Sequence, residues 1–382
     1  MSESTLISTE DRIFYAAVKL FSKNWYRTVS VAAICRDAGL SNGVFYRYYK
    51  NKEVLFRKIL ENVLEMIRSE VEAPQGSGPR ERLRSLVSAL VSFSRTHPEL
   101  IAVFREGQYR FFEYERRLVS IYLKSLAVAV GRDMSHPEYL FALGGVRFCS
   151  IRSALQGVRI EVDDLAAILC DGLFRGMSFD AERVFGGSAD PLPVSLDENA
   201  RGRLLFSGKR LFAEKGFFET NIHEVTDGAG LSVGAFYNYF ESKEVFLAEI
   251  IRRVGHEVRS FIARNLPAAD GLPLNRLERE LRGLWLWLVY LSIDKDCYTI
   301  VREAEFVLPG AVHEYYGYFV DGYHKNPEGN GDADQTTAIE FLLGIAHYFG
   351  IEAAFDSYSW SSRAAVETIG GYLAHGFSQW LD

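Results

Sequence analysis

A phrase of 17 residues occurs twice in this chain, with the copies half a chain apart. Residues 38–54 read AGLSNGVFYRYYKNKEV and residues 229–245 read AGLSVGAFYNYFESKEV, with 11 identical positions at an offset of 191 in 382 residues. The match extends upstream to Leu20-Phe21 and Leu211-Phe212, and weaker matches continue downstream. Such a repeat indicates duplication of a whole folding unit. We therefore expect two similar units, one in each half.

The apolar pattern between the breaks is helical. Ile13, Ala16, Ala17, Leu20 and Phe21 follow the i, i+3, i+4, i+7, i+8 spacing of one helix face. We find no convincing strand-like alternation and predict an all-α protein. Gly, Pro, Ser and Asp gather at 186–195, which indicates a linker. The predicted organisation is a short domain at 1–57, a longer domain at 58–180, a linker at 181–198, a second short domain at 199–248 and a second longer domain at 249–382.

Each copy of the phrase predicts a helix, a tight turn and a second helix. In the first copy the helices are expected at 31–37 and 42–48, Gly39 suits a turn with positive φ, and Ser41 suits an N-cap. In a helix-turn-helix the second helix enters the major groove and flanking groups hold phosphates. Phe45 should then face the core. The candidate DNA-binding residues are Ser41, Asn42, Gly43, Val44, Tyr46, Arg47, Tyr48 and Lys52, and in the second copy Ser232, Val233, Gly234, Ala235, Tyr237, Asn238, Tyr239 and Lys243.

Residues 20–55 and 211–246 each resemble the tetracycline-repressor (TetR) family of bacterial transcription regulators. The resemblance implies three N-terminal helices that bind DNA, followed by a helical domain that binds a small ligand and supplies a four-helix dimer interface. The chain resembles two such subunits fused in tandem. The family has Thr where Thr220 stands, whereas Val29 occupies that position in the first copy. We include Thr220 among the DNA-binding candidates, and Ser30 as a candidate that should also cap its helix.

Charge separates the two copies. The whole chain has a net charge of −7, which excludes a basic coat over its full surface. Residues 1–57 hold nine Lys or Arg against five Asp or Glu, a balance of +4, whereas residues 197–250 hold six against nine, a balance of −3. Because phosphate neutralisation carries much of DNA affinity, the first copy is predicted to bind more strongly. The second is either a weak or a decayed DNA-binding domain.

The longer domains at 58–180 and 249–382, which the resemblance makes the regulatory domains, contain candidate ligand-binding residues. Each candidate also has a purely structural explanation. Arg105-Glu106 and Arg302-Glu303 repeat in corresponding places, and aromatic residues follow both pairs. Ordinary salt bridges and core packing account for most such residues. As ligand-binding candidates we name Arg105, Phe111, Tyr122, Arg302, Tyr315 and Phe319.

The remaining patterns exclude other functions. The four cysteines form no CxxC pair, the histidines show no metal spacing, and no catalytic arrangement stands out, so we predict no catalytic residue, metal or cofactor. The polar N-terminus and short apolar runs predict no membrane segment and a cytoplasmic location.

The expected function is repression of transcription, with double-stranded DNA and an unknown small-molecule effector as partners, and with release from an asymmetric operator when the effector binds. The last two helices of each half, at about 138–158 with 163–178 and 335–356 with 361–380, are expected to pair in an intrachain pseudo-twofold dimer, and further homodimerisation stays open. The rival interpretation is a protein-interaction or small-molecule-binding module with vestigial DNA-binding domains.

Overall fold

The computed structural model describes residues 8–187, 189–190, 199–324, 335–355 and 361–381, and within these ranges it contains helices and no strand. Two compact units divide the chain. Unit 1 comprises residues 1–171 with 336–344 and 377–382, and unit 2 comprises residues 172–335 with 345–376. The predicted all-α class is confirmed.

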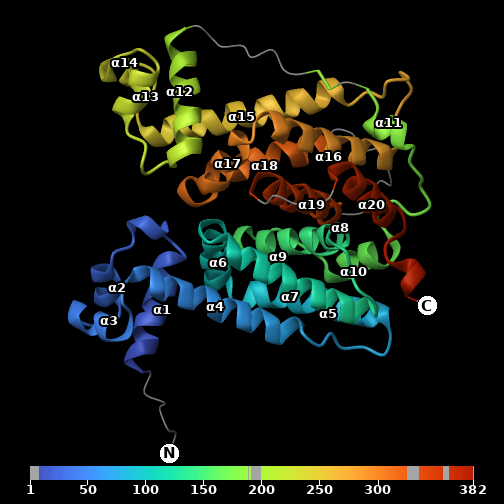
Figure 1. Ribbon diagram of the computed structural model, residues 1–382, viewed down its shortest axis with the longest axis horizontal. Coiled ribbons are helices and arrows are strands. Elements are labelled where there is room, and N and C mark those ends of the chain that lie inside the picture. The colour runs from blue at the N-terminus through green and yellow to red at the C-terminus, as the bar shows by residue number, and fades with distance from the viewer. Residues whose placement is uncertain (1–7, 188, 191–198, 325–334, 356–360, 382) are drawn as a thin grey trace, which may run out of the picture. The chain divides into compact units, whose positions relative to one another are not determined.

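Unit 1 begins with a small helical group at one end of a long helix (Figure 1). Its helices are α1 (Thr9–Phe21), the 3-10 turn η1 (Tyr26–Thr28), α2 (Val31–Asp37), α3 (Asn42–Tyr48), α4 (Lys52–Val71), α5 (Pro79–Thr96), α6 (Pro98–Arg110), α7 (Phe112–Val130), α8 (His136–Tyr139), the π-helical turn η2 (Leu140–Gly144), α9 (Gly145–Gln156) and α10 (Val162–Asp171). The predicted apolar stripe of α1 lies in the core, where Ile13, Ala17 and Phe21 are buried.

Unit 2 repeats this order, with α12, α13 and α14 gathered at one end of α15 (Figure 1). Its helices are α11 (Ala181–Phe185), α12 (Ala200–Lys215), α13 (Ile222–Gly228), α14 (Val233–Tyr237), α15 (Lys243–Asn265), α16 (Arg276–Ile293), α17 (Asp296–Val307), α18 (Pro309–His324), most of α19 (Thr336–Phe355) and α20 (Ser362–His375). The 3-10 turn η3 (Ser378–Trp380) belongs to unit 1.

The core of unit 1 is completed by residues from the second half of the sequence. A Cβ added to Gly145 of α9 would lie 2.3 Å from the Phe341 ring, and one added to Gly344 would lie 2.6 Å from Phe148, so glycine permits this close helix approach. The guanidinium of Arg152 donates to both carboxylate oxygens of Glu340 at 2.9 and 2.8 Å. Small residues at 145 and 344 therefore allow these two helices to pack closely in unit 1.

Two predicted boundaries differ from the structure. Residues 181–185, which we expected in the linker, form α11, because Val184 and Phe185 are apolar and become buried. The helix expected to continue to residue 178 ends at Asp171, and Gly172 follows with a φ of 82°. The rest of the predicted linker at 191–198, and residue 188, lie outside the described residues.

The Arg152–Glu340 pair gives a test of this packing. Arg152→Ala should lower the free energy of unfolding by about 3 to 5 kcal/mol, because it leaves the Glu340 carboxylate buried without its charge partner. Denaturant unfolding followed by circular dichroism measures the loss. Arg84→Ala is the control, since its ion pair with Asp163 is exposed. Equal effects of the two variants would contradict the buried pairing.

Candidate nucleic-acid interface and ligand cavities

The first helix-turn-helix is held by local backbone chemistry. The Ser30 hydroxyl accepts a hydrogen bond from Ala33 N at 3.1 Å and caps α2. Gly39 adopts a φ of 67° in the turn, which favours glycine. Arg12 of α1 donates from Nη2 to the carbonyl of Ala38 at 2.6 Å and fixes the turn from outside. The predicted turn and the Ser30 cap are confirmed.

The helix α3 separates a buried face from an exposed face. Phe45 is fully buried and anchors the helix in the core, as predicted. Tyr46 and Tyr48 are 60% and 44% exposed, and Asn42, Gly43 and Arg47 are also exposed, whereas Val44 is half-buried. Ser41 occupies the N-cap position. A short helix that presents amide, guanidinium and phenol groups together offers suitable groups for base edges and phosphates.

Lys52 has a structural role that the sequence did not reveal. Its Nζ donates to the carbonyls of Tyr26 and Val29, both at 2.7 Å, and lies 4.2 Å from the centre of the Tyr26 ring. Burial lowers the pKa of this ammonium group. Lys52 therefore ties the start of α4 to the loop before α2, and substituting it would disturb the fold as well as any phosphate contact.

The second helix-turn-helix has the same construction with stronger capping. Asn221 and Glu224 form a capping box at the start of α13. Ser232 caps α14 by accepting from Ala235 N at 3.2 Å, and Gly230 adopts a φ of 64°. Phe236 is buried. The exposed residues of the predicted set are Ser232, Val233, Gly234, Tyr237, Asn238 and Tyr239, and Ala235 is half-buried.

The placement of Thr220 contradicts its predicted contact with DNA. Thr220 is 1% exposed, and its hydroxyl donates to the carbonyls of Leu211 at 3.1 Å and Gly216 at 2.9 Å. Val29, at the same place in the first copy, is also buried. The position therefore belongs to the core, where a hydroxyl can close the end of α12. Lys243 is half-buried, with its Nζ 4.3 Å from the centre of the Phe217 ring.

The structure adds one pair of surface residues that the motif did not single out. Lys50 follows α3 and is exposed, and Glu241 is exposed at the corresponding place after α14. The offset of 191 that relates the two phrases also relates these two residues. Lys50 and Glu241 have opposite charges and lie next to the second helix of each motif. Part of the charge difference between the halves therefore lies beside these helices.

A carboxylate links each regulatory domain to its helix-turn-helix. Glu106 of α6 is 2% exposed and accepts from the backbone N–H of Tyr26 at 2.9 and 3.1 Å. Arg110 also donates to it at 3.4 Å. Burial raises the pKa of Glu106 to about 7, against the opposing effect of the Tyr26 N–H and Arg110. Glu303 of α17 makes the equivalent bond, accepting from Phe217 N at 3.0 Å.

The loop that receives this carboxylate differs between the halves. In unit 2 Gly216 has a φ of 84°, and an added Cβ would lie 2.8 Å from the Glu303 carboxylate. Trp25 stands at the corresponding position in the first copy with a φ of −54°. The chain then turns through η1 and still presents the Tyr26 N–H to Glu106.

Two of the predicted ligand-binding residues line a small cavity in unit 1. The cavity measures about 30 Å³, and Arg105 and Tyr122 contribute to its wall together with Gln108 and Arg147. Phe111 lies elsewhere, because its ring stacks under the Arg57 guanidinium at 3.7 Å. Glu106 instead pairs with Arg110 and the Tyr26 backbone. The two adjacent residues Arg105 and Glu106 therefore have different roles.

In unit 2 the predicted ligand-binding residues gather only in part. Tyr315 lines a crevice of about 10 Å³ between α15 and α18, with Arg259 in its wall. Phe319 lies beside this crevice, 5.6 Å from the Arg259 guanidinium. Arg302 is outside the residues that line it.

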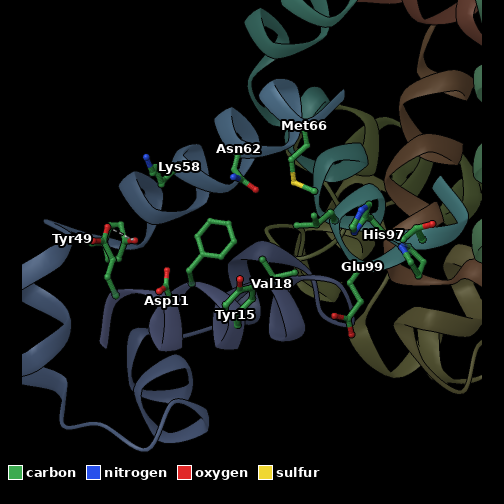
Figure 2. Close-up of a pocket in the computed structure, with 14 residues that line it drawn as sticks. Asp11, Tyr15, Val18, Tyr49, Lys58, Asn62, Met66, His97 and Glu99 are labelled. Atoms are coloured by element: carbon green, nitrogen blue, oxygen red, sulfur yellow. Dashed lines mark hydrogen bonds between the residues drawn. The ribbon is translucent and has the colours of Figure 1, made fainter. Parts of the chain in front are cut away.

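A larger open groove of about 740 Å³ runs between α1 and α4 and ends at the junction of α5 and α6. Figure 2 shows Asp11, Tyr15 and Val18 on one side and Asn62 and Met66 on the other. Its lining mixes exposed acids and aromatic rings.

The described residues contain no group of three or more His, Cys, Asp or Glu side chains placed to hold a metal ion. Among them, too, no helix has both the length and the apolar character needed to cross a membrane.

Comparison with known proteins matches the two helix-turn-helix segments and longer stretches of the chain. The family of bacterial regulatory proteins described as tetR matches residues 13–59 and 204–250. The HTH-type transcriptional regulator YerO of Bacillus subtilis is 22% identical to this chain, over 50% of this chain and 73% of its own length. The HTH-type transcriptional regulator YuxN of the same organism is 23% identical, over 61% of this chain and 92% of its own length.

Among solved structures, a TetR-like transcriptional regulator from Rhodococcus sp. RHA1 aligns with 42% of this chain and 90% of its own, at 24% identity and a TM-score of 0.36. The family match falls on both halves, on the segments that form α1 to α4 and α12 to α15. The chain is a tandem TetR-like DNA-binding transcriptional regulator, with one helix-turn-helix of the family in each half.

Proposed function

We propose that this chain is a repressor that binds an asymmetric operator through its two helix-turn-helix domains and leaves it when a small molecule binds. The observation that carries the proposal is the exposed face of α3, where Asn42, Tyr46 and Arg47 project from a helix anchored by the buried Phe45. The relative KstR2 of Mycobacterium tuberculosis is named as a repressor and is 40% identical over 52 residues. That match supports the same sense of regulation.

The asymmetry of the operator follows from differences between the two reading helices. Arg47 corresponds to Asn238, and Lys50 corresponds to Glu241. Arginine can donate two hydrogen bonds to guanine, whereas asparagine suits adenine. A homodimer must present identical helices, but two domains of one chain can diverge. We propose a strong half-site under residues 1–57 and a weak one under residues 199–248.

The two halves are proposed to pair as an intrachain pseudo-dimer. Support comes from unit 1, where residues 336–344 of the second half pack on α9 through Gly344 and the Arg152–Glu340 pair. The regions 1–57, 58–180, 199–248 and 249–382 remain our proposed functional domains, with residues 181–185 reassigned to α11. The chain would act on chromosomal DNA in the cytoplasm, as a regulator and without enzymatic activity.

Release by a ligand requires a link between cavity and DNA-binding domain, and α6 is the proposed link. It carries Arg105 and Gln108, which line the unit 1 cavity, and Glu106, which holds the Tyr26 N–H. A ligand that displaces α6 would therefore loosen the bond to the loop before α2. The effect on affinity equals the preference of the ligand for the displaced state.

The rival proposal is a protein-interaction or ligand-binding module with vestigial DNA-binding domains. It assigns no function to the exposed basic and aromatic residues of α3 and of the loop after it. Binding of the purified protein to its own upstream DNA, in excess nonspecific DNA, distinguishes the two.

Reversing charge beside the recognition helices should have opposite effects in the two halves. Lys50→Glu should weaken binding to all sequences by about tenfold and lower the salt slope by about one, because a phosphate-facing cation is lost. Glu241→Lys should extend DNase footprint protection over the weak half-site. The exposed Lys124→Glu on α7 is the control. Equal losses from the Lys50 and Lys124 variants would contradict the assigned surface.

Base reading by Arg47 should appear as a change of sequence preference. Arg47→Ala should cost about 1 to 3 kcal/mol at one position of the strong half-site and leave the other positions unchanged. Asn238→Ala should alter only the weak half-site. Selection from a random DNA pool, repeated with each variant, measures both. A symmetric palindrome selected by the unmodified protein, with both halves equally protected, would overturn the asymmetric operator.

Glu106 should give the folded protein a defined pH dependence. Its pKa is raised from 4.5 to about 7 in the folded state, so its contribution to stability is complete below about 4.5 and is lost as the pH rises through about 7. Glu106→Gln keeps an acceptor for the Tyr26 N–H and should remove this component. Denaturant unfolding between about pH 5 and pH 8 measures it, with the exposed Glu70→Gln as control. Parallel curves for the Glu106 variant and the unmodified protein would contradict the assignment.

A further inference from the structure

The open groove of unit 1, between α1, α4 and the junction of α5 and α6, is large enough for an organic molecule. Its volume of about 740 Å³ is typical of sites that bind small molecules. Val18 of α1 and Met66 of α4 lie between its two ends (Figure 2), and Phe14 adds an aromatic ring to the same lining. The middle of the groove therefore offers an apolar surface.

Carboxylates stand at both ends of the groove. Glu10 and Asp11 belong to the first turn of α1 at one end, and Glu99 belongs to the first turn of α6 at the other (Figure 2). The seven residues from Asp11 to Val18 span about 10 Å of helix axis, so the two ends are separate charged positions. Among the lining residues, Lys58 supplies the only ammonium group, against three carboxylates.

The groove does not neutralise its own charges. Asp11 and Glu10 accept hydrogen bonds from neutral hydroxyl groups, at 2.7 and 3.1 Å. Within the described part of the chain, the side chains of Glu99 and Lys58 make no hydrogen bond and no ion pair. All four side chains are exposed, so the excess negative charge is available to a ligand.

The internal repeat identifies the counterpart of this groove in unit 2. An offset of 191 relates α1 to α12 and α4 to α15. An offset of 197 relates α5 to α16, which begin at residues 79 and 276 and end at residues 96 and 293. The counterparts of Glu10, Val18, Lys58, Met66, His97 and Glu99 are Arg201, Lys209, Glu249, Glu257, Asp294 and Asp296, respectively.

Ion pairs cross this place in unit 2. The Nζ of Lys209 donates to Asp294 and, at 3.3 Å, to Glu257. Nη2 of Arg201 lies 2.7 Å from a carboxylate oxygen of Glu249. These pairs join α12 to α15 and to the residue that ends α16. Unit 2 therefore uses its own cationic side chains to connect the first helix of its helix-turn-helix domain with the helices that follow.

The described residues of unit 1 provide no such connection across the groove. Val18 and Met66 are uncharged, and Glu10 and Lys58 form no ion pair with each other although their charges are opposite. A helix that unit 2 ties with ammonium and guanidinium groups thus lies beside an open acidic groove in unit 1. Two separate acidic ends favour two cationic groups over one, and the apolar middle favours methylene groups between them.

We propose that this groove binds a linear aliphatic diamine or polyamine, with one ammonium group at Asp11 and another at Glu99. The methylene chain lies against Val18 and Met66. The bound amine connects α1 with α6, as Lys209 connects α12 with the end of α16 in unit 2. This inference goes beyond the proposed function, because it assigns a second site outside the small cavity and does not depend on the release of DNA.

Calorimetric titration of the full chain, freed of nucleic acid, tests the class with diaminooctane, octylamine and octanediol. Diaminooctane should bind about fivefold more tightly than octylamine, which is the upper range for one exposed ion pair, and octanediol should not bind. Diaminopropane is too short to reach both ends and should bind no better than octylamine. Binding of octylamine as tight as that of diaminooctane, or binding of neither, would overturn the proposal.

A pair of matched variants locates the site. Glu99→Gln removes the acidic group at one end and should lower the affinity for diaminooctane about fivefold, to that of a monoamine. Asp296→Asn changes the counterpart in unit 2 and should leave the affinity unchanged. Equal losses in the two variants would contradict the placement of the site in unit 1.

A double variant copies the closure of unit 2 into unit 1. Val18→Lys together with Met66→Glu sets an ion pair across the groove and should abolish the binding of diaminooctane. Undiminished binding in the folded double variant would refute the site. Because Val18 is buried, circular dichroism must first show that this variant keeps its helices. If the double variant misfolds, the comparison of Glu99→Gln with Asp296→Asn decides the question.

Discussion

The proposed response to a ligand depends on the hydrogen bond from the Tyr26 N–H to the buried Glu106 carboxylate. It joins a helix of the regulatory domain to the loop that precedes the first helix-turn-helix. Ionised carboxylates are costly to bury, so the site supplies a backbone donor, Arg110 and the nearby Lys52 ammonium. The second half keeps the same solution with Glu303 and the Phe217 N–H, although its loop has a different conformation. Two copies have thus retained one carboxylate on one backbone N–H while the surrounding residues changed.

Divergence between the halves concentrates where the fold allows it. Phe45 and Phe236 are both buried and identical, because each anchors its recognition helix in a close-packed core. Lys50 and Glu241 are both exposed, and the fold is indifferent to their charge. Gln108 and Glu305 differ inside the regulatory domains, where each polar group requires its own partners. A duplicated chain can therefore alter DNA and ligand chemistry separately in each half without altering the helices that carry them.

The sequence predicted what depends on local patterns. The turn glycine Gly39, the Ser30 cap and the buried Phe45 follow from residues close together in the chain, and all three are confirmed. The predictions that did not hold depend on contacts between distant residues. Thr220 was expected on the surface as a contact to DNA, but its hydroxyl donates to the carbonyls of Leu211 and Gly216. Phe111 and Tyr122 looked equivalent as aromatic residues after an Arg-Glu pair, but only the packing of α4, α5 and α9 decides which of them reaches the cavity.

The helix α6 combines three contacts within four successive residues. Arg105 and Gln108 line the cavity, Glu106 holds the Tyr26 N–H, and Gly107 lies so close to α4 that an added Cβ would be 2.3 Å from Leu60. Because an α-helix has about 3.6 residues per turn, four successive residues point toward different neighbours. They belong to one rigid helix and therefore move together. Close-packed interiors do not absorb such a displacement locally. Enlarging the cavity must therefore either compress α6 against Leu60 or carry Glu106 away from its donor, and the second route costs one hydrogen bond instead of a repacked core.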